Sequence, residues 1–237
     1  MELYIIRHAQ STNNALADQK GRVCDPALTD LGMRQAKILA NHLANGKKRE
    51  PLWRRSDDGH QPGYGLTRLY CSAMWRALQT AQPIGRALGL KPEVWLDIHE
   101  QGGIFLNPED ADGPVGYPGK TRSEILAEFP DTILPEAVTE DGWWSGGYED
   151  WPACKDRAIR VAGELRRMAG SGGRIALISH GGFIDILLKA LFNQLPSLNF
   201  FYFHYNTAIT RIDFRDGGYL DVNYLNRVDH LPPDLIS

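Results

Sequence analysis

Runs of mainly hydrophobic residues mark four predicted strands. The runs lie at residues 3–6, 67–71, 93–98 and 174–179. They are short and largely apolar at successive positions, which is typical of strands in a parallel sheet that is covered on both faces. The pattern therefore predicts a buried sheet with other elements packed on each side.

Hydrophobic residues at helical spacing occupy the segments between these strands. Thr29 or Asp30 is the expected N-cap of the first helix, and Pro83 is expected to kink the second helix or to divide it. Pro152 stands near the first turn of a later helix, where proline is tolerated. The predicted helices cover residues 29–44, 72–89, 121–129, 150–170 and 183–192.

The tail of the chain has a different pattern. Residues 207–226 alternate between apolar and polar positions on both sides of the turn sequence Asp216-Gly217-Gly218, which predicts an antiparallel hairpin. Strands that alternate with helices and end in a hairpin predict an α/β fold. We expect a three-layer α/β/α sandwich with a mostly parallel central sheet and a late antiparallel hairpin.

Two stretches do not fit this alternation. Residues 45–66 are polar, rich in Gly and Pro, and hold the main basic cluster, so a solvated loop is expected there. Residues 101–150 hold several Gly, Pro and aromatic residues but only one clear short helix. An excursion of this length is either a lid or specificity element or a structural insertion. We expect a single domain over residues 1–237 with this excursion at about residues 101–150.

Composition limits the classes of function. The 237 residues carry a net charge of −3, so nothing in the overall charge favours binding to nucleic acid or to an anionic membrane. No apolar run approaches the roughly 18 residues of a transmembrane helix, and the chain begins on a strand-like segment instead of a signal peptide. The three cysteines are far apart, which disfavours a structural zinc site and disulfide bonds. We expect a cytoplasmic protein.

Polar side chains follow the carboxyl end of each predicted parallel strand. Ligands bind at this edge in open parallel sheets. Two arginines buried together would need an anionic partner, because an unpaired buried charge is costly, and the planar guanidinium group suits bidentate capture of phosphate. The residues that the strand ends supply are Arg7 and His8, Ser72 and Arg76, His99 and Glu100, and His180 before Gly181 and Gly182.

A phosphate monoester fits this set of side chains. Arg7 and Arg76 can balance its charge while His180 adds a donor, which leaves His8 free to attack phosphorus as a nucleophile. Glu100 is the acid available to protonate the leaving oxygen. We expect no metal and no cofactor, because the sequence holds no H-x-H, H-E-x-x-H or aspartate cluster at ligand spacing.

Four segments, in this order along the chain, resemble the histidine phosphatase superfamily, in the branch that includes cofactor-dependent phosphoglycerate mutases. The acid phosphatase and phytase branch is disfavoured, since it would show R-H-G-x-R-x-P and an H-D pair. The four segments are RHAQSTNN at residues 7–14, LTDLGMRQA at 28–36, SAMWRALQTA at 72–81 and SHGG at 179–182.

The resemblance implies a phosphoglycerate mutase-like fold and specific roles. His8 would be the nucleophile that forms a phosphohistidine. Glu100 matches the position of the proton donor, although the residues after it read QGGIF instead of the usual G-x-W-E-G continuation. The residues implied to bind the phosphoryl group are Arg7, Arg76 and His180, with a further contact from Asn14.

These observations predict a metal-independent phosphatase that hydrolyses small-molecule phosphate monoesters through a phosphohistidine on His8. One alternative is a phosphotransferase of the cofactor-dependent phosphoglycerate mutase type, but no Y-x-R-R-x-[YF]-D segment lies between Glu100 and Asp150. Another is a non-catalytic protein of the same fold that binds phosphorylated ligands. The oligomeric state stays open, and a homodimer through the late hairpin is one possibility.

Overall fold

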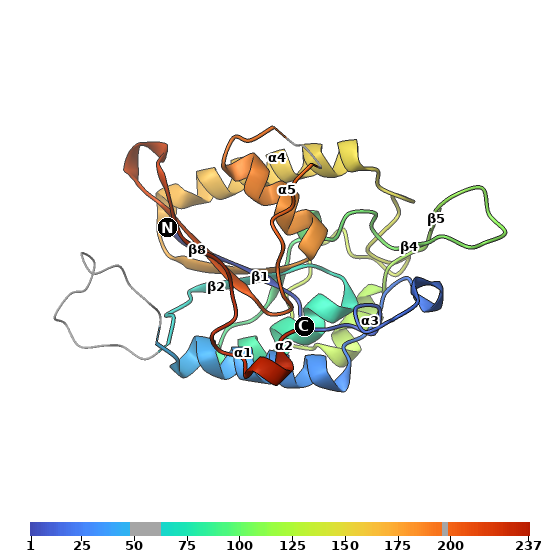
Figure 1. Ribbon diagram of the computed structural model, residues 1–237, viewed down its shortest axis with the longest axis horizontal. Coiled ribbons are helices and arrows are strands. Elements are labelled where there is room, and N and C mark those ends of the chain that lie inside the picture. The colour runs from blue at the N-terminus through green and yellow to red at the C-terminus, as the bar shows by residue number, and fades with distance from the viewer. Residues whose placement is uncertain (48–62, 196–198) are drawn as a thin grey trace.

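A six-stranded sheet forms the centre of the computed structural model, which describes residues 1–47, 63–195 and 199–237 (Figure 1). Most of the predicted loop at 45–66, with its basic cluster, lies outside the described residues. The strand order is β3-β2-β6-β1-β7-β8, in which the first four strands are parallel and the last two form the antiparallel hairpin. The bounds are Glu2–Arg7 for β1, Arg68–Cys71 for β2, Glu93–Val94 for β3, Arg174–Ser179 for β6, Ile209–Phe214 for β7 and Leu220–Arg227 for β8.

Two pairs of helices cover the two faces of this sheet. In Figure 1, α1 and α2 lie below the strands, and α4 and α5 lie above them. Strand β1 serves both layers, because Leu3 and Ile5 are buried with α4 and α5 while Tyr4 and Ile6 are buried with α1 and α2. The predicted three-layer sandwich is confirmed. The helices are α1 at Asp30–Asn45, α2 at Trp75–Leu88, α4 at Trp151–Met168 and α5 at Gly181–Leu191.

The register of the sheet brings three strand ends to one level. Arg7 of β1 pairs with Ser179 of β6, and Cys71 of β2 pairs with Ile178. The next residue of each strand therefore leaves the sheet at the same edge. The backbone N–H of His8 still donates to the Ser179 carbonyl, at 2.9 Å, which fixes the first residue beyond β1.

The predicted strand at 93–98 is wrong over most of its length. Strand β3 pairs with β2 only at Tyr70 and Cys71, and β2 ends there because the chain turns toward α2. Without a partner strand, the chain forms a short 3₁₀ helix at Leu96–Ile98. This turn directs the following residues, His99 and Glu100, toward the end of β6, where the Ser179 hydroxyl donates to the Ile98 carbonyl at 2.8 Å.

The helix boundaries test the expected start and stop signals. Thr29 is the N-cap of α1, and its side chain accepts from the Gly32 N–H at 3.0 Å. Helix α2 begins at Trp75 instead of Ser72, and its first N–H donates to Asp25 of a distant loop. Pro83 stands inside α2 without dividing it, so the expected division is wrong.

The excursion at 101–150 packs partly into the main core. It contains the hairpin of β4 (Phe105–Leu106) and β5 (Val115–Gly116), which projects at the right of Figure 1, and α3 at Arg122–Glu128, whose N-terminus has a capping box of Thr121 and Glu124. Its apolar side chains belong to the same core cluster as those of α1 and α2. The buried ones are Ile104, Ile125, Phe129, Val138 and Trp143.

The chain also contains further short 3₁₀ helices and three free cysteines. The helices lie at Gln19–Gly21, Ala169–Ser171, Asp216–Gly218 and Pro233–Leu235. Cys24, Cys71 and Cys154 form no disulfide. None of the helices in the described part of the chain has both the length and the hydropathy that crossing a membrane requires.

A fully buried ion pair fixes helix α5 to the segment that follows it. The Lys189 ammonium donates to Asp185 at 2.8 Å and to the Phe200 carbonyl at 2.7 Å, and the other Asp185 oxygen accepts from the Tyr202 N–H at 2.9 Å. Both charged side chains are 0% exposed. A buried charge that loses its partner costs far more than an exposed one, so this pair is a strict requirement for the placement of residues 200–202.

We therefore expect Lys189→Met to lower the free energy of unfolding by about 3–5 kcal/mol, because Asp185 would remain buried without its cation. Lys120→Met is the matched control, since it removes an exposed pair with Glu124 and should change stability by less than about 0.5 kcal/mol. Urea denaturation of both variants measures the difference, and equal effects would contradict the argument.

Candidate active site

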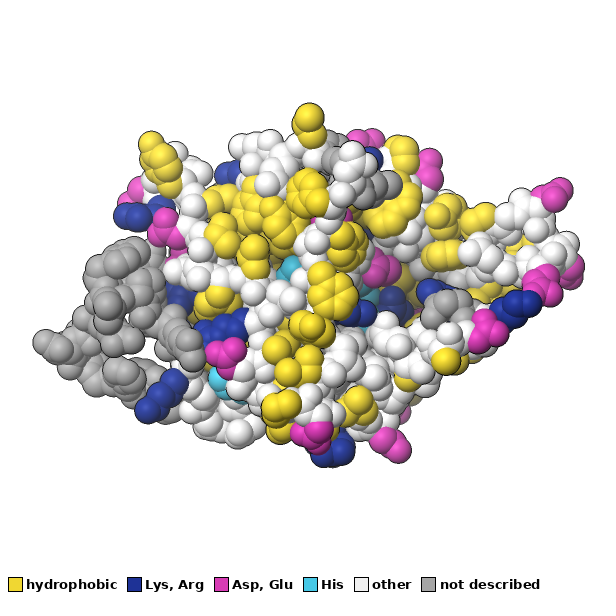
Figure 2. Space-filling view, in the orientation of Figure 1, with side chains coloured by type: hydrophobic (Ala, Val, Ile, Leu, Met, Phe, Trp, Pro, Cys, Tyr) yellow, Lys and Arg dark blue, Asp and Glu magenta, His cyan; other side chains and the backbone are white. Residues whose placement is uncertain are grey.

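Two histidines and an arginine meet at the carboxyl edge of the sheet. The rings of His8 and His180 lie 5.0 Å apart, and Arg76 Nε donates to His8 Nε2 at 3.1 Å. The three residues are 3%, 0% and 8% exposed respectively. In Figure 2, histidine and charged side chains are recessed between hydrophobic surface and the excursion that carries β4 and β5. The predicted convergence of the strand ends is present.

The hydrogen bonds of His8 fix its tautomer. Nδ1 lies 2.7 Å from the Ala9 carbonyl, which can only accept, so Nδ1 carries the proton. Nε2 is then unprotonated, and it accepts from Arg76. Burial lowers the pKa of His8 well below its usual value, and the charges of Arg76 and Arg7 lower it further. His8 is therefore a neutral imidazole with a lone pair on Nε2.

Several buried polar atoms beside His8 have no hydrogen-bond partner within the described residues. They are Nε of Arg7 and both ring nitrogens of His180. Arg7 is held in place by its Nη1, which donates to the His204 carbonyl at 2.6 Å. Burial lowers the pKa of His180 well below its usual value, with a contribution from Arg76. A neutral imidazole has one N–H donor, so the Nε–H of Arg7 and one N–H of His180 are buried donors without a partner beside His8 within the described residues. Since buried polar groups are normally paired, such donors indicate a site that binds an anion.

The second arginine is fixed from both ends. Arg76 Nη1 lies 3.8 Å from Asp25, which also accepts from the first N–H of α2. The Thr80 hydroxyl donates to the Arg76 carbonyl at 2.7 Å and accepts from the Ala9 N–H at 3.1 Å. One hydroxyl thus connects the helix that carries Arg76 to the loop that follows His8.

Glu100 lies at the N-terminus of α5 and faces the same site. Its carboxylate accepts from the N–H groups of Gln101 at 2.9 Å, Gly182 at 3.1 Å and Phe183 at 2.8 Å. The charge of Glu100 acts on both arginines, since it partly offsets the lowering of their pKa values that burial causes. A Cβ on Gly182 would lie 2.8 Å from the Glu100 carboxylate, which explains the second glycine of the His-Gly-Gly sequence.

Asn14 reaches the site through Asn206. The Asn206 side-chain amide donates to the His8 carbonyl at 2.9 Å and to Asn14 Oδ1 at 3.3 Å. Asn14 Oδ1 also accepts from the N–H and the hydroxyl of Ser11. These donors fix the orientation of the amide, so the NH₂ group of Asn14 points away from them.

The structure shows what the glutamine of the LTDLGMRQA segment does. Gln35 of α1 accepts from the Gln10 N–H and donates to the Leu235 carbonyl and the Ser237 hydroxyl. The described end of the chain therefore packs behind the loop that follows His8. Four other supporting residues were not singled out by the sequence patterns, and none of them lies next to a predicted strand end: Asp25, Glu149, Arg157 and Asn206.

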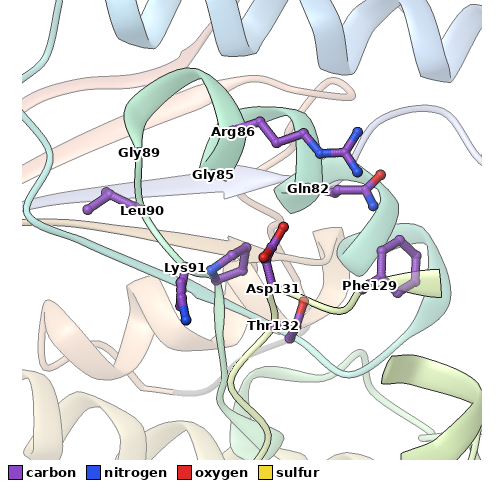
Figure 3. Close-up of a pocket in the computed structure, with 10 residues that line it drawn as sticks. Gln82, Gly85, Arg86, Gly89, Leu90, Lys91, Phe129, Asp131 and Thr132 are labelled. Atoms are coloured by element: carbon purple, nitrogen blue, oxygen red, sulfur yellow. The ribbon is translucent and has the colours of Figure 1, made fainter. Parts of the chain in front are cut away.

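A separate cavity of about 220 Å³ lies at the opposite edge of the sheet (Figure 3). Its lining includes Arg86, Lys91 and Asp131, and the loop at 89–92 directly precedes β3. It therefore belongs to the amino end of the parallel strands, whereas the histidines lie at the carboxyl end. None of its lining residues is a predicted site residue.

Over residues 1–47, 63–195 and 199–237, no three His, Cys, Asp or Glu side chains are grouped so that they could hold a metal ion.

Comparison with known proteins agrees with this geometry. A family model described as histidine phosphatase superfamily (branch 1) matches residues 3–52 and 60–226. A glucosyl-3-phosphoglycerate phosphatase of Mycolicibacterium vanbaalenii is 30% identical over 196 residues, which cover 80% of this chain and 73% of that protein. A probable phosphoglycerate mutase, GpmB, of Yersinia pestis is 22% identical, covering 93% of this chain and 88% of the relative.

A solved structure extends the similarity to the fold. Phosphoserine phosphatase from Entamoeba histolytica, in complex with 3-phosphoglyceric acid, superimposes with a TM-score of 0.60 at 19% identity. The match covers 98% of this chain and 99% of the other. The predicted phosphoglycerate mutase-like fold is thereby confirmed.

Gly182→Ala tests the contact with Glu100. The added Cβ would collide with the carboxylate, so we expect a loss of phosphatase activity of at least about tenfold with little loss of folded protein. Gly163→Ala is the control, because nothing lies within 4 Å of a Cβ there and alanine favours helix. Steady-state kinetics and thermal melting measure both variants, and full activity of Gly182→Ala would contradict the assigned contact.

Asp25→Asn tests the buried carboxylate beside Arg76. Burial raises the pKa of Asp25 from its ordinary value of 3.8 to about 6, so the folded protein binds an extra proton between those pH values. This group therefore favours the folded state less as the pH rises from 4 to 7. We expect the stability of the parent relative to Asp25→Asn to fall by roughly 2 kcal/mol over that range. Urea denaturation at several pH values measures the free energy of unfolding of both proteins. Parallel curves of this free energy against pH would contradict the prediction.

Proposed function

The chain belongs to branch 1 of the histidine phosphatase superfamily, and from this premise we propose that it hydrolyses phosphate monoesters through a phosphohistidine on His8, without a metal. One observation carries the proposal. The neutral His8 Nε2 accepts from Arg76 beside His180, whose two ring nitrogens are buried and unpaired within the described residues. An anionic phosphoryl group placed there would give the N–H of the neutral His180 ring a partner and put phosphorus in reach of a nucleophile.

In the first step the lone pair of His8 Nε2 forms a bond to phosphorus. The bond from phosphorus to the ester oxygen breaks, and its electron pair stays on that oxygen. Glu100, in its protonated form, donates the proton that the leaving alkoxide needs. Arg7, Arg76 and His180 stabilise the charge on the non-bridging oxygens, and the NH₂ group of Asn14 adds a contact.

In the second step water replaces the alcohol. The Glu100 carboxylate takes a proton from the water, and the resulting hydroxide oxygen bonds to phosphorus. The bond from His8 Nε2 to phosphorus breaks, so inorganic phosphate forms and the neutral imidazole returns. Glu100 regains the proton that it gave in the first step. The cycle closes without a cofactor.

The names of the similar proteins support small phosphorylated molecules as substrates. They include a glucosyl-3-phosphoglycerate phosphatase and a phosphoserine phosphatase bound to 3-phosphoglyceric acid. The excursion at 101–150 is the element proposed to select among such esters. Two of its aromatic residues, Trp144 and Tyr148, are partly exposed. The centre of the Trp144 ring lies 4.7 Å from that of His99, and the centre of the Tyr148 ring lies 4.8 Å from that of Phe105.

A mutase-type phosphotransferase is the second candidate, because one relative carries the name probable phosphoglycerate mutase. Both activities begin with the same phosphohistidine. They differ in whether the phosphoryl group passes to water or to a bound phosphoglycerate. The lack of a Y-x-R-R-x-[YF]-D segment in the excursion favours water.

The decisive experiment is hydrolysis of p-nitrophenyl phosphate in excess EDTA. We expect turnover in the parent protein and a loss of at least about 10³-fold in His8→Ala, because the nucleophile is gone. Rapid quenching with a ³²P-labelled ester should trap an acid-labile phosphoprotein in the parent and none in His8→Ala.

Other outcomes would overturn the proposal. Activity that EDTA removes and a metal restores would contradict the metal-free mechanism. Efficient isomerisation of phosphoglycerate that depends on a bisphosphoglycerate, together with slow hydrolysis, would make the protein a mutase. Phosphate binding with no labelled intermediate would favour a non-catalytic binding protein.

A further inference from the structure

Arg157 of α4 is a buried cation outside the residues that contact the proposed phosphate site. Its side chain is 3% exposed, and all five of its N–H donors are used. Nε and Nη2 bind the two oxygens of Glu149 at 2.7 and 2.5 Å, and Nη2 also lies 3.6 Å from the sulfur of Cys154. Nη1 donates to the carbonyls of Asp97 at 2.7 Å and His99 at 3.0 Å.

The two carbonyls that Arg157 binds belong to the segment that leads into Glu100. Strand β3 ends at Val94, and after the bond from the Trp95 N–H to the Cys71 carbonyl, at 2.9 Å, no sheet hydrogen bond from the described part of the chain holds residues 97–99. The His99 carbonyl is part of the peptide bond to Glu100 itself. Arg157 therefore supplies, from another layer of the fold, the restraint that a longer strand would have supplied.

Arg157 also supports the other side of Glu100. Its guanidinium carbon lies 4.4 Å from the centre of the Phe183 ring, and the N–H of Phe183 donates to the Glu100 carboxylate. One planar group thus contacts both the main chain before Glu100 and the residue that holds its carboxylate. This double contact distinguishes Arg157 from an ordinary structural ion pair.

Glu149 connects the same arginine to the excursion. Its N–H donates to the Gly102 carbonyl at 3.2 Å, and its own carbonyl accepts from the Gln101 side chain at 2.7 Å. The excursion therefore begins directly after Glu100, and its last residues pack against its first ones, Gln101 and Gly102. The Glu149 carboxylate, 8% exposed, neutralises Arg157 where the loop closes.

We propose that Arg157 is the positioning residue for Glu100. It fixes the main chain before Glu100 and packs on the ring of Phe183, whose N–H holds the carboxylate, and Glu149 orients Arg157 in turn. The proposal rests on the function given above, in which Glu100 protonates the leaving oxygen. A proton donor displaced by about an ångström loses much of its effect, and the loss depends on how much the leaving group needs the proton.

The test is therefore a series of leaving groups. Arg157→Lys keeps the positive charge but cannot bind a carboxylate and two carbonyls together. We expect kcat/KM for phenyl phosphate, whose leaving group is poor, to fall roughly 10–100-fold. For 2,4-dinitrophenyl phosphate, whose leaving group needs no proton, we expect a change of less than about threefold.

Glu100→Gln, alone and combined with Arg157→Lys, separates the proposed role of Glu100 as the acid from the proposed role of Arg157 in positioning it. Glu100→Gln should show the same selective loss on phenyl phosphate, and Arg157→Lys added to it should cause no further loss, because both act on one proton transfer. If Glu100→Gln shows no dependence on the leaving group, the assignment of Glu100 as the acid fails. If Glu100→Gln shows it and Arg157→Lys does not, the positioning role fails.

Two further variants keep the result interpretable. Arg160→Met changes an exposed arginine of the same helix and should leave kcat/KM for both esters unchanged. Glu149→Gln keeps the shape of the partner of Arg157 and should reproduce a weaker form of the same selective loss. Equal loss on both esters in Arg157→Lys and Glu149→Gln would mean that the pair serves folding alone, which would overturn the proposal.

Discussion

The burial of two guanidinium groups beside two neutral histidines is the constraint on which the rest of the structure depends. Such a cluster is unfavourable unless an anion completes it. Asp25 and Glu100 offset part of the charge, yet Nε of Arg7 and both nitrogens of His180 have no partner within the described residues. The fold must therefore tolerate the desolvation of these polar atoms, of which the Arg7 Nε–H and one N–H of the neutral His180 are donors.

Holding these groups in place takes contacts from every layer of the fold. The first strand brings His8 beside His180 because β1 pairs with β6 in register. The hydroxyl of Thr80 connects the helix of Arg76 to the loop after His8. The Lys189–Asp185 pair fixes the segment whose His204 carbonyl binds Arg7. Rigid elements thus carry the residues of the candidate site, and buried polar contacts set their orientation.

The sequence predicts the centre of this arrangement well for a physical reason. Parallel strands end at one edge of the sheet, so residues that follow different strands, such as His8 and His180, come together there. This prediction does not require the conformation of any loop to be known. The sequence predicts the supports poorly. Arg157 looks like one more basic residue of an amphipathic helix, and only its burial against the His99 carbonyl shows otherwise. The end of β3 depends equally on tertiary structure, because its length is set by where β2 stops.

The closed base of the excursion separates its exposed tip from the residues beside Glu100. The Gly102 carbonyl accepts from the Glu149 N–H, so the two ends of the intervening segment are joined beside Glu100. The connection between β4 and β5, at residues 107–114, is mostly exposed, and an exposed loop can gain, lose or exchange residues at small entropic cost. A change in the length of this connection can therefore alter the surface beside the candidate site while the joined base stays in place.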